Sequence, residues 1–157
     1  MNIKIICVGK LKEKFLVDAC KEYGKRLGRF CRLEIIEIPD RKNPDTESVK
    51  LCLEVMDKEG KDILSKIKNE YVIALCIEGK KYKSETLAEK IETLKNNGGK
   101  ITFVIGGSLG LSDEVKERAD EKLSFSDMTF PHGIARVLLL EQVYRGFKII
   151  SGESYHK

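Results

Sequence analysis

The sequence predicts an α/β fold in which a mainly parallel sheet is flanked by helices, and two observations support this expectation. Segments that read as strands alternate along the chain with segments whose apolar residues recur at helical spacing. Two strand segments, residues 71–79 and 100–107, are nearly continuous apolar runs, as expected where helices cover both faces of a parallel sheet. No internal repeat or linker interrupts the pattern, so we expect one domain over residues 1–157.

The first part of the chain predicts two strands, each followed by a helix. Residues 2–8 read as a strand, and apolar residues recur at helical spacing within residues 16–27. Residues 31–39 read as a second strand that a proline ends. We expect the next helix to follow Asp45 as its N-cap, with Gly60 as a weak point because glycine costs a helix about 1 kcal/mol relative to alanine.

The middle of the chain predicts a strand, a helix and another strand. Residues 71–79 read as a buried strand bounded by charge and by glycine. We expect Ser84 to cap the next helix and the pair Gly98 and Gly99 to end it. Residues 100–107 read as the strand that follows.

The last part of the chain predicts a short helix, a short strand and a long apolar helix. Ser112 is the expected N-cap of the short helix, and residues 122–126 read as the strand. Residues 134–150 read as the long helix, which residues 137–140 make apolar nearly all round. Such a helix needs cover on more than one side, so we expect a homodimer that uses it.

The basic residues are distributed unevenly although the net charge is small. Lysine and arginine total 29 against 25 acidic residues, and the resulting +4 does not by itself indicate a nucleic-acid partner. The basic residues nevertheless gather in three groups. These are Lys10, Lys12 and Lys14; Lys21, Lys25, Arg26, Arg29 and Arg32; and Lys80, Lys81 and Lys83 around Tyr82. An anionic partner is permitted, and the alternative for the first two groups is the solvated face of a helix.

The five cysteines form no CxxC pair and only two histidines accompany them, so we expect reduced thiols and no metal site. The N-terminus lacks the features of a signal peptide, and no stretch approaches the roughly 18 consecutive apolar residues of a membrane span. We therefore expect a cytoplasmic protein.

Ligands of open parallel sheets bind beyond the carboxyl ends of the strands, here in the loops after Ile77, Ile105 and Ser126. Gly106 and Gly107 allow the backbone to approach a ligand closely or to adopt positive φ, and a plain tight turn is the alternative. A dinucleotide site is a weak competitor because Ile105 occupies the first glycine position of its G-x-G-x-x-G motif. No phosphate-loop motif occurs in the sequence.

Three stretches carry a resemblance to a known family: FVIGGSLGLS at 103–112, LSFSDMTFPHGIARVLLLEQVYRGFKI at 123–149 and YHK at 155–157. With the opening IKIICVGK, they resemble the RlmH family of ribosomal RNA large-subunit methyltransferases, of the SPOUT class, over essentially the whole chain. The resemblance implies a deep C-terminal trefoil knot within about residues 72–157 and an obligate homodimer. It also implies S-adenosylmethionine as methyl donor and, as substrate, N3 of a pseudouridine in the helix 69 stem-loop of 23S rRNA on the assembled ribosome.

The resemblance implies that the cofactor contacts lie in the same three loops. Apolar side chains there suit the flat faces of adenine, while backbone groups suit its polar edges. For Leu75 and Phe125 packing in the core is the alternative, and Asp127 looks replaceable in the family motif. The implied contacts are Leu75, Ile77, Gly106, Gly107, Phe125, Ser126, Asp127, Met128, Thr129 and Phe130.

The acceptor N3 carries a proton that must leave, and the resemblance suggests which groups help. His156 is the candidate base because the ordinary pKa of histidine lies near 6.5, and Arg145 could stabilise negative charge on the flanking carbonyl oxygens. Tyr155 could stack on a base, with Lys157 meeting phosphate. The alternatives are that residues 155–157 only close the dimer interface and that Arg145 only pairs with Glu141 four residues before it.

Two residues near the start of the last helix have alternatives of their own, and two rival functions remain. A cap or backbone contact is expected for His132 rather than catalysis, and Arg136 could be either structural or functional. The rival functions are a non-catalytic ribosome-binding factor and an oxidoreductase that uses a nucleotide cofactor.

Overall fold

The computed structural model describes residues 1–42 and 48–154. Within these residues the chain forms five strands and five helices that alternate regularly, as the sequence predicts. In chain order they are β1 (Asn2–Val8), α1 (Lys14–Leu27), β2 (Arg32–Ile38), α2 (Val49–Leu64), β3 (Tyr71–Lys81), α3 (Ser84–Asn96), β4 (Lys100–Ile105), α4 (Asp113–Arg118), β5 (Glu121–Ser124) and α5 (His132–Ile150).

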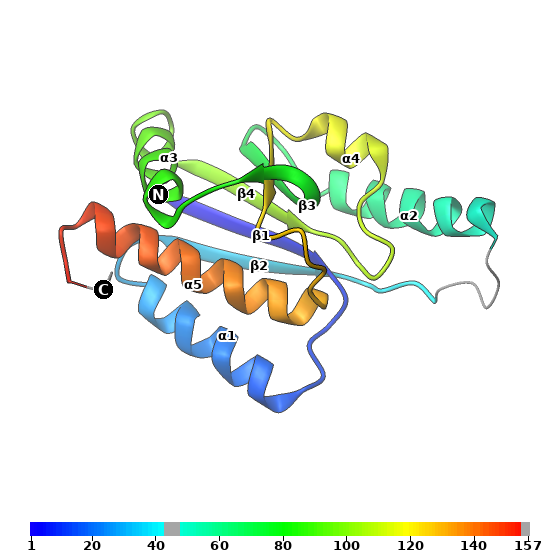
Figure 1. Ribbon diagram of the computed structural model, residues 1–157, viewed down its shortest axis with the longest axis horizontal. Coiled ribbons are helices and arrows are strands. Elements are labelled where there is room, and N and C mark those ends of the chain that lie inside the picture. Colours follow the sequence, from blue (N-terminus) through cyan, green and yellow to red (C-terminus); the bar gives the residue numbers. More distant parts are fainter. Residues whose placement is uncertain (43–47, 155–157) are drawn as a thin grey trace.

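The strands form one sheet in the order β2-β1-β4-β3-β5, and every neighbouring pair is parallel. The predicted mainly parallel sheet is therefore confirmed. Because all strands point the same way, their carboxyl ends meet at one edge of the sheet. The loops that follow β1, β4 and β5 lie along that edge, and β3 bends back there (Figure 1).

Helices cover both faces of the sheet: α1, α3 and α5 lie on one face, and α2 and α4 on the other (Figure 1). Successive strand residues point to opposite faces. In β1, Ile5 and Cys7 are buried beneath the first set of helices, whereas Ile6 and Val8 are buried beneath the second. This double burial explains why the strands read as continuous apolar runs rather than as an alternating pattern.

The strand β3 curls over β5. Leu123 of β5 pairs with two residues of β3: with Leu75 and, beyond a register shift, with Lys80. Gly79 permits this curl, since a Cβ at its position would lie 2.6 Å from the carbonyl carbon of Leu123. As a result β3 extends to Lys81, beyond the predicted end of the strand at residue 79.

The predicted helix caps were only partly right. Asp45 lies outside the described residues, and Ser48 is the N-cap of α2. Ser84 is the first helical residue rather than the cap, and its hydroxyl donates to Gln142 Oε1 of α5 at 2.7 Å, so the side chain joins two helices. Ser112 does occupy the N-cap of α4, but its buried Oγ makes no hydrogen bond within the described part of the chain. The end of α3 is as predicted, because Gly98 and Gly99 follow it with φ of 100° and 63°.

The helix α5 packs between α1 and α3, and every one of its residues is at least partly buried. Near its start the guanidinium of Arg136, 2% exposed, donates to Glu37 Oε1 at 2.7 Å and to the Gly9 carbonyl at 2.9 Å. The beginning of α5 is thereby fixed to the ends of β1 and β2. The described helices include none that is long and apolar enough to cross a membrane.

Candidate functional site

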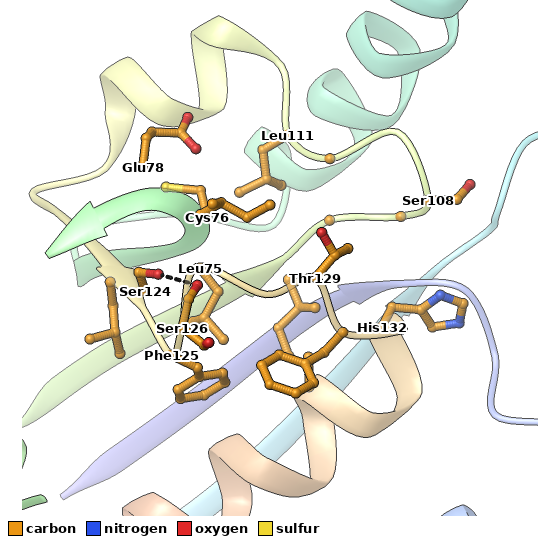
Figure 2. Close-up of a pocket in the computed structure, with 18 of the residues that line it drawn as sticks. Leu75, Cys76, Glu78, Ser108, Leu111, Ser124, Phe125, Ser126, Thr129 and His132 are labelled. Atoms are coloured by element: carbon orange, nitrogen blue, oxygen red, sulfur yellow. Dashed lines mark hydrogen bonds between the residues drawn. The ribbon is translucent and has the colours of Figure 1, made fainter. Parts of the chain in front are cut away.

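A pocket of about 430 Å³ opens at the carboxyl ends of β3, β4 and β5. Figure 2 shows Leu75 of β3 and, from the loop between β5 and α5, Phe125 and Thr129 around it. The volume falls in the range of roughly 300–1,000 Å³ that is usual for sites that bind small molecules. Most lining side chains are apolar. The complete lining consists of residues 75–78, 105–111, 123–126 and 128–130, with Lys116, His132 and Ala135.

One wall of the pocket is the tight glycine turn after β4. Gly107 and Gly110 form an antiparallel bridge, and the Gly110 N–H donates to the Gly107 carbonyl at 3.1 Å. Gly110 has φ of 90°, the left-handed conformation that glycine adopts at little cost. A Cβ on Gly106 would lie 2.6 Å from the Gly110 carbonyl oxygen, so Gly106 is required for close approach rather than for positive φ.

The opposite wall is the loop between β5 and α5. The hydroxyl of Ser124 donates to the Ser126 carbonyl at 3.0 Å (Figure 2), and Ser126 Oγ accepts the N–H of Met128 at 3.1 Å. These two hydrogen bonds constrain the shape of the loop. The same loop carries Phe125 and Phe130, which supply much of the apolar lining.

The ionised groups of the wall neutralise each other. Glu78 and Lys116 form an ion pair at 2.7 Å between the end of β3 and α4. Their hydrogen bond lowers the pKa of Glu78 and raises the pKa of Lys116. Burial raises the pKa of the neighbouring Cys76 thiol, which is consequently a poor nucleophile at neutral pH.

A carboxyl group is buried directly behind the glycine turn. Glu59 of α2 is 3% exposed, and its Oε1 accepts the backbone N–H of Arg41 at 3.0 Å. A Cβ on Gly107 would lie 3.3 Å from its Oε2. Burial raises the pKa of Glu59 above its ordinary value. Sequence reasoning missed this residue, although its spacing from Ile63 on the buried side of α2 was an available signal.

The structure brings together nine of the ten residues that the resemblance implies for cofactor contact. Those lining the pocket are Leu75, Ile77, Gly106, Gly107, Phe125, Ser126, Met128, Thr129 and Phe130. Asp127 is the exception, because its 81% exposed side chain forms an ion pair with Lys81. His132 also lines the pocket, from the first turn of α5. Cys76, Glu78 and Ser124 also line the pocket and adjoin predicted contacts in the sequence, whereas only the fold brings Lys116 to the site.

Of the residues expected to act in catalysis, only Arg145 lies within the described part of the chain. Arg145 pairs with Glu141 on the same helix, with Nη2 2.5 Å from Oε1, and does not line the pocket. Tyr155, His156 and Lys157 lie outside the described residues. Residues 1–42 and 48–154 contain no group of three or more side chains that could hold a metal ion, and all five cysteines are free thiols.

Comparison with known proteins gives a consistent result over the whole chain. A family model described as predicted SPOUT methyltransferase matches residues 1–156. The chain is 59% identical to a Clostridium perfringens (strain SM101) protein named ribosomal RNA large subunit methyltransferase H 1, over 100% of both chains. Proteins named ribosomal RNA large subunit methyltransferase H from Clostridium beijerinckii and Clostridioides difficile (strain 630) are each 56% identical, again over 100% of both chains.

A solved structure shares the fold at low sequence identity. It is described as a probable methylase family protein from Haemophilus influenzae Rd KW20. The TM-score is 0.54 at 14% identity, and the match covers 96% of this chain and 66% of the other. Likeness at this identity supports the α/β architecture alone.

Proposed function

The chain belongs to the SPOUT methyltransferase family, and we propose that it methylates N3 of a pseudouridine in the helix 69 stem-loop of 23S rRNA on the assembled ribosome. The chain's relatives are named as large-subunit rRNA methyltransferases, which makes rRNA the substrate class. The observation that carries the proposal is that the glycine turn and the loop before α5 both line one pocket.

The residues of the pocket fit S-adenosylmethionine, which SPOUT methyltransferases use and which supplies an electrophilic methyl group. Leu75, Phe125 and Phe130 offer apolar surface for the adenine faces. Gly106 and Gly107 bring backbone without side chains to the wall of the site, and Ser126 and Thr129 add hydroxyl groups. Because Asp127 points to Lys81, its backbone rather than its carboxylate is expected to contribute.

Methyl transfer to N3 requires alignment of donor and acceptor and removal of the N3 proton. We propose His156 as the base, Arg145 as the group that stabilises negative charge on the flanking carbonyl oxygens, and Tyr155 as a stacking partner of the target. The Glu141 carboxylate holds Arg145 along α5 and would have to share it with the substrate.

A homodimer is part of the proposal. Next to the pocket a second hollow, also apolar, lies between the start of α3 and the outer side of α5, where Leu138 and Phe130 are only partly buried. A second copy of the chain packed there would complete the burial of α5. Its tail, residues 155–157, could then close the site of either subunit.

We further propose that the cofactor-binding part of this single domain, within about residues 72–157, forms the deep trefoil knot of its family. The support is the curl of β3, which pairs with Leu123 on both sides of its register shift and so encloses β5. The chain then continues from β5 to α5 on the opposite face from α4. Action on ribosomes would also place the protein in the cytoplasm.

The decisive experiment incubates the protein with labelled S-adenosylmethionine and ribosomes from a strain that lacks it, and then maps the labelled nucleotide. Label on the helix 69 pseudouridine is expected. A ribosome-binding factor without catalysis would show no saturable binding of S-adenosylmethionine by calorimetry, and an oxidoreductase would bind NAD instead.

Deletion of residues 155–157 is expected to abolish methylation while cofactor affinity stays within a few fold, and undiminished turnover would refute the role of the tail.

A further inference from the structure

The segment from Gly9 to Phe15, called the basic loop here, comprises the connection between β1 and α1 and the first two residues of α1, at the same edge of the sheet as the pocket. Its backbone is held at the start. Gly9 has φ of 87°, donates its N–H to the Ile38 carbonyl at 2.9 Å and accepts from Arg136 at 2.9 Å. The start of the loop is therefore fixed to the end of β2 and to α5.

The apolar residues of the basic loop face inward and fix it to α5. Leu11 packs against the main core, and a Cβ on Gly133 would lie 3.0 Å from its Cδ2. The same Cβ would lie 2.9 Å from Cδ1 of Leu16, the residue that follows the loop. The loop and the first turn of α5 thus form one packed unit.

The remaining side chains of the basic loop are exposed, and one of them, Glu13, is acidic, which leaves three cations against one anion. Lys10, Lys12 and Lys14 are exposed, and over the described part of the chain no carboxylate forms an ion pair with them. Phe15 is 66% exposed. A single exposed aromatic ring among three lysines is too small an apolar patch for a typical protein interface, but it combines the two features that single-stranded RNA requires: cations for phosphate and a flat ring for stacking.

The basic loop stands at the rim of the pocket. A Cβ on Gly9 would lie 3.0 Å from Nε2 of His132, and His132 lines the pocket. An RNA stem-loop that presents its target base to a cofactor held in the pocket can therefore pass its neighbouring nucleotides close to this loop.

We infer that the basic loop is a docking surface for the RNA substrate, on which Phe15 stacks against an unpaired base next to the target while Lys10, Lys12 and Lys14 contact its phosphates. This inference rests on the proposed function. It gives the chain an RNA-positioning surface separate from the cofactor contacts.

The test measures methylation of ribosomes as a function of ribosome concentration. Phe15→Ala is expected to raise KM about tenfold, the loss typical of one base stacked on an aromatic ring, with the affinity for S-adenosylmethionine unchanged. Phe15→Tyr keeps an aromatic ring and is expected to have the wild-type KM. Replacing Lys10, Lys12 and Lys14 by Gln is expected to lower the slope of log affinity against log salt by about 2, since each phosphate contact on a single strand contributes about 0.7.

Matched controls lie on α2, on the opposite face of the sheet. Val49 is 72% exposed, and Lys50, Lys58 and Lys61 are exposed lysines of the same helix. Val49→Ala and the triple lysine-to-Gln change there are expected to leave KM and the salt slope at the wild-type values.

The outcomes separate the inference from the function on which it rests. If the wild-type protein labels no rRNA, the proposed function fails. If it labels rRNA and the loop variants keep the wild-type KM, or lose no more than the α2 controls, the inference is overturned and the function stands. A Phe15→Ala protein whose subunits dissociate at higher concentration than the wild type would instead assign the ring to contact between two copies of the chain, and this too would overturn the inference.

Discussion

Gly79 of β3 lies directly against the backbone of Leu123 in β5: a Cβ at Gly79 would stand 2.6 Å from the carbonyl carbon and 2.7 Å from the nitrogen of that residue. The contact lets β3 fold over β5, so that Cys76, Ile77 and Glu78 face the pocket rather than continue a flat strand. The shape of one pocket wall therefore depends on the absence of a single side chain.

Gly79→Ala is expected to destabilise the protein by about 1–3 kcal/mol, because neither backbone can move away without breaking the pairing of β3 with β5. Urea denaturation gives the free energy of unfolding. Gly24→Ala is the control. Gly24 lies inside α1, and its new methyl group would meet Leu33 of β2 at 3.8 Å, so this change is expected to stabilise the protein by about 0.5–1 kcal/mol. Equal stability of the Gly79→Ala and wild-type proteins would show that the curl tolerates a side chain.

Gly106→Ala is expected to weaken binding of S-adenosylmethionine at least tenfold. The added Cβ would lie 2.6 Å from the Gly110 carbonyl oxygen and would open the bridge between Gly107 and Gly110 that shapes the wall. Isothermal titration calorimetry measures the dissociation constant. Ser108→Ala in the same turn adds no bulk and is expected to change it by less than threefold; a larger loss in Ser108→Ala than in Gly106→Ala would contradict the steric explanation.

The ion pair between Arg136 and Glu37 predicts an asymmetric response to mutation. Glu37→Ala leaves a guanidinium that is only 2% exposed without its carboxylate, and we expect a loss of about 3–5 kcal/mol in the free energy of unfolding. Arg136→Met leaves a carboxylate whose side chain is 33% exposed and can be hydrated, so we expect a smaller loss of about 1–3 kcal/mol. Chemical denaturation of both variants checks the order, and a greater loss in Arg136→Met would reverse the argument.

Those parts of the fold that local pattern determines were predictable. The strands β1 and β4 follow from apolar runs, and the helical spacing of Leu16, Cys20 and Leu27 places α1 correctly. Even the end of α3 follows from Gly98, because a left-handed residue stops a helix whatever packs against it.

Features that depend on residues distant in sequence were not predictable in this way. The sequence predicts Ser84 as a helix cap, but in the structure its hydroxyl donates to Gln142 of α5, which is far away in the sequence. The sequence places Asp127 among the pocket contacts, but in the structure its carboxylate forms an ion pair with Lys81 at the end of β3 and lies outside the pocket. The three pocket loops followed from the rule for parallel sheets and the individual cofactor contacts from the family resemblance, whereas no spacing rule brings Glu78 to Lys116.

The buried carboxyl group of Glu59 predicts a pH dependence of stability with a definite sign. Burial raises its pKa in the folded protein above the ordinary value of 4.5. A carboxyl group with a raised folded pKa stabilises the folded state fully below pH 4.5, and this contribution is lost as the pH rises through the folded pKa. Glu59→Gln is neutral at every pH and retains an oxygen that can accept the Arg41 N–H.

The free energy of unfolding of Glu59→Gln, minus that of the wild type, should therefore increase as the pH is raised from 4.5 and become constant above the folded pKa. Urea denaturation of both proteins between pH 4 and pH 8 measures this difference, and other carboxyl groups such as Glu78 cancel because both proteins contain them. Asp57→Gln, at an exposed position of the same helix, is expected to show no such trend. A difference that stays constant with pH, or that falls, would mean that Glu59 is not desolvated behind the glycine turn.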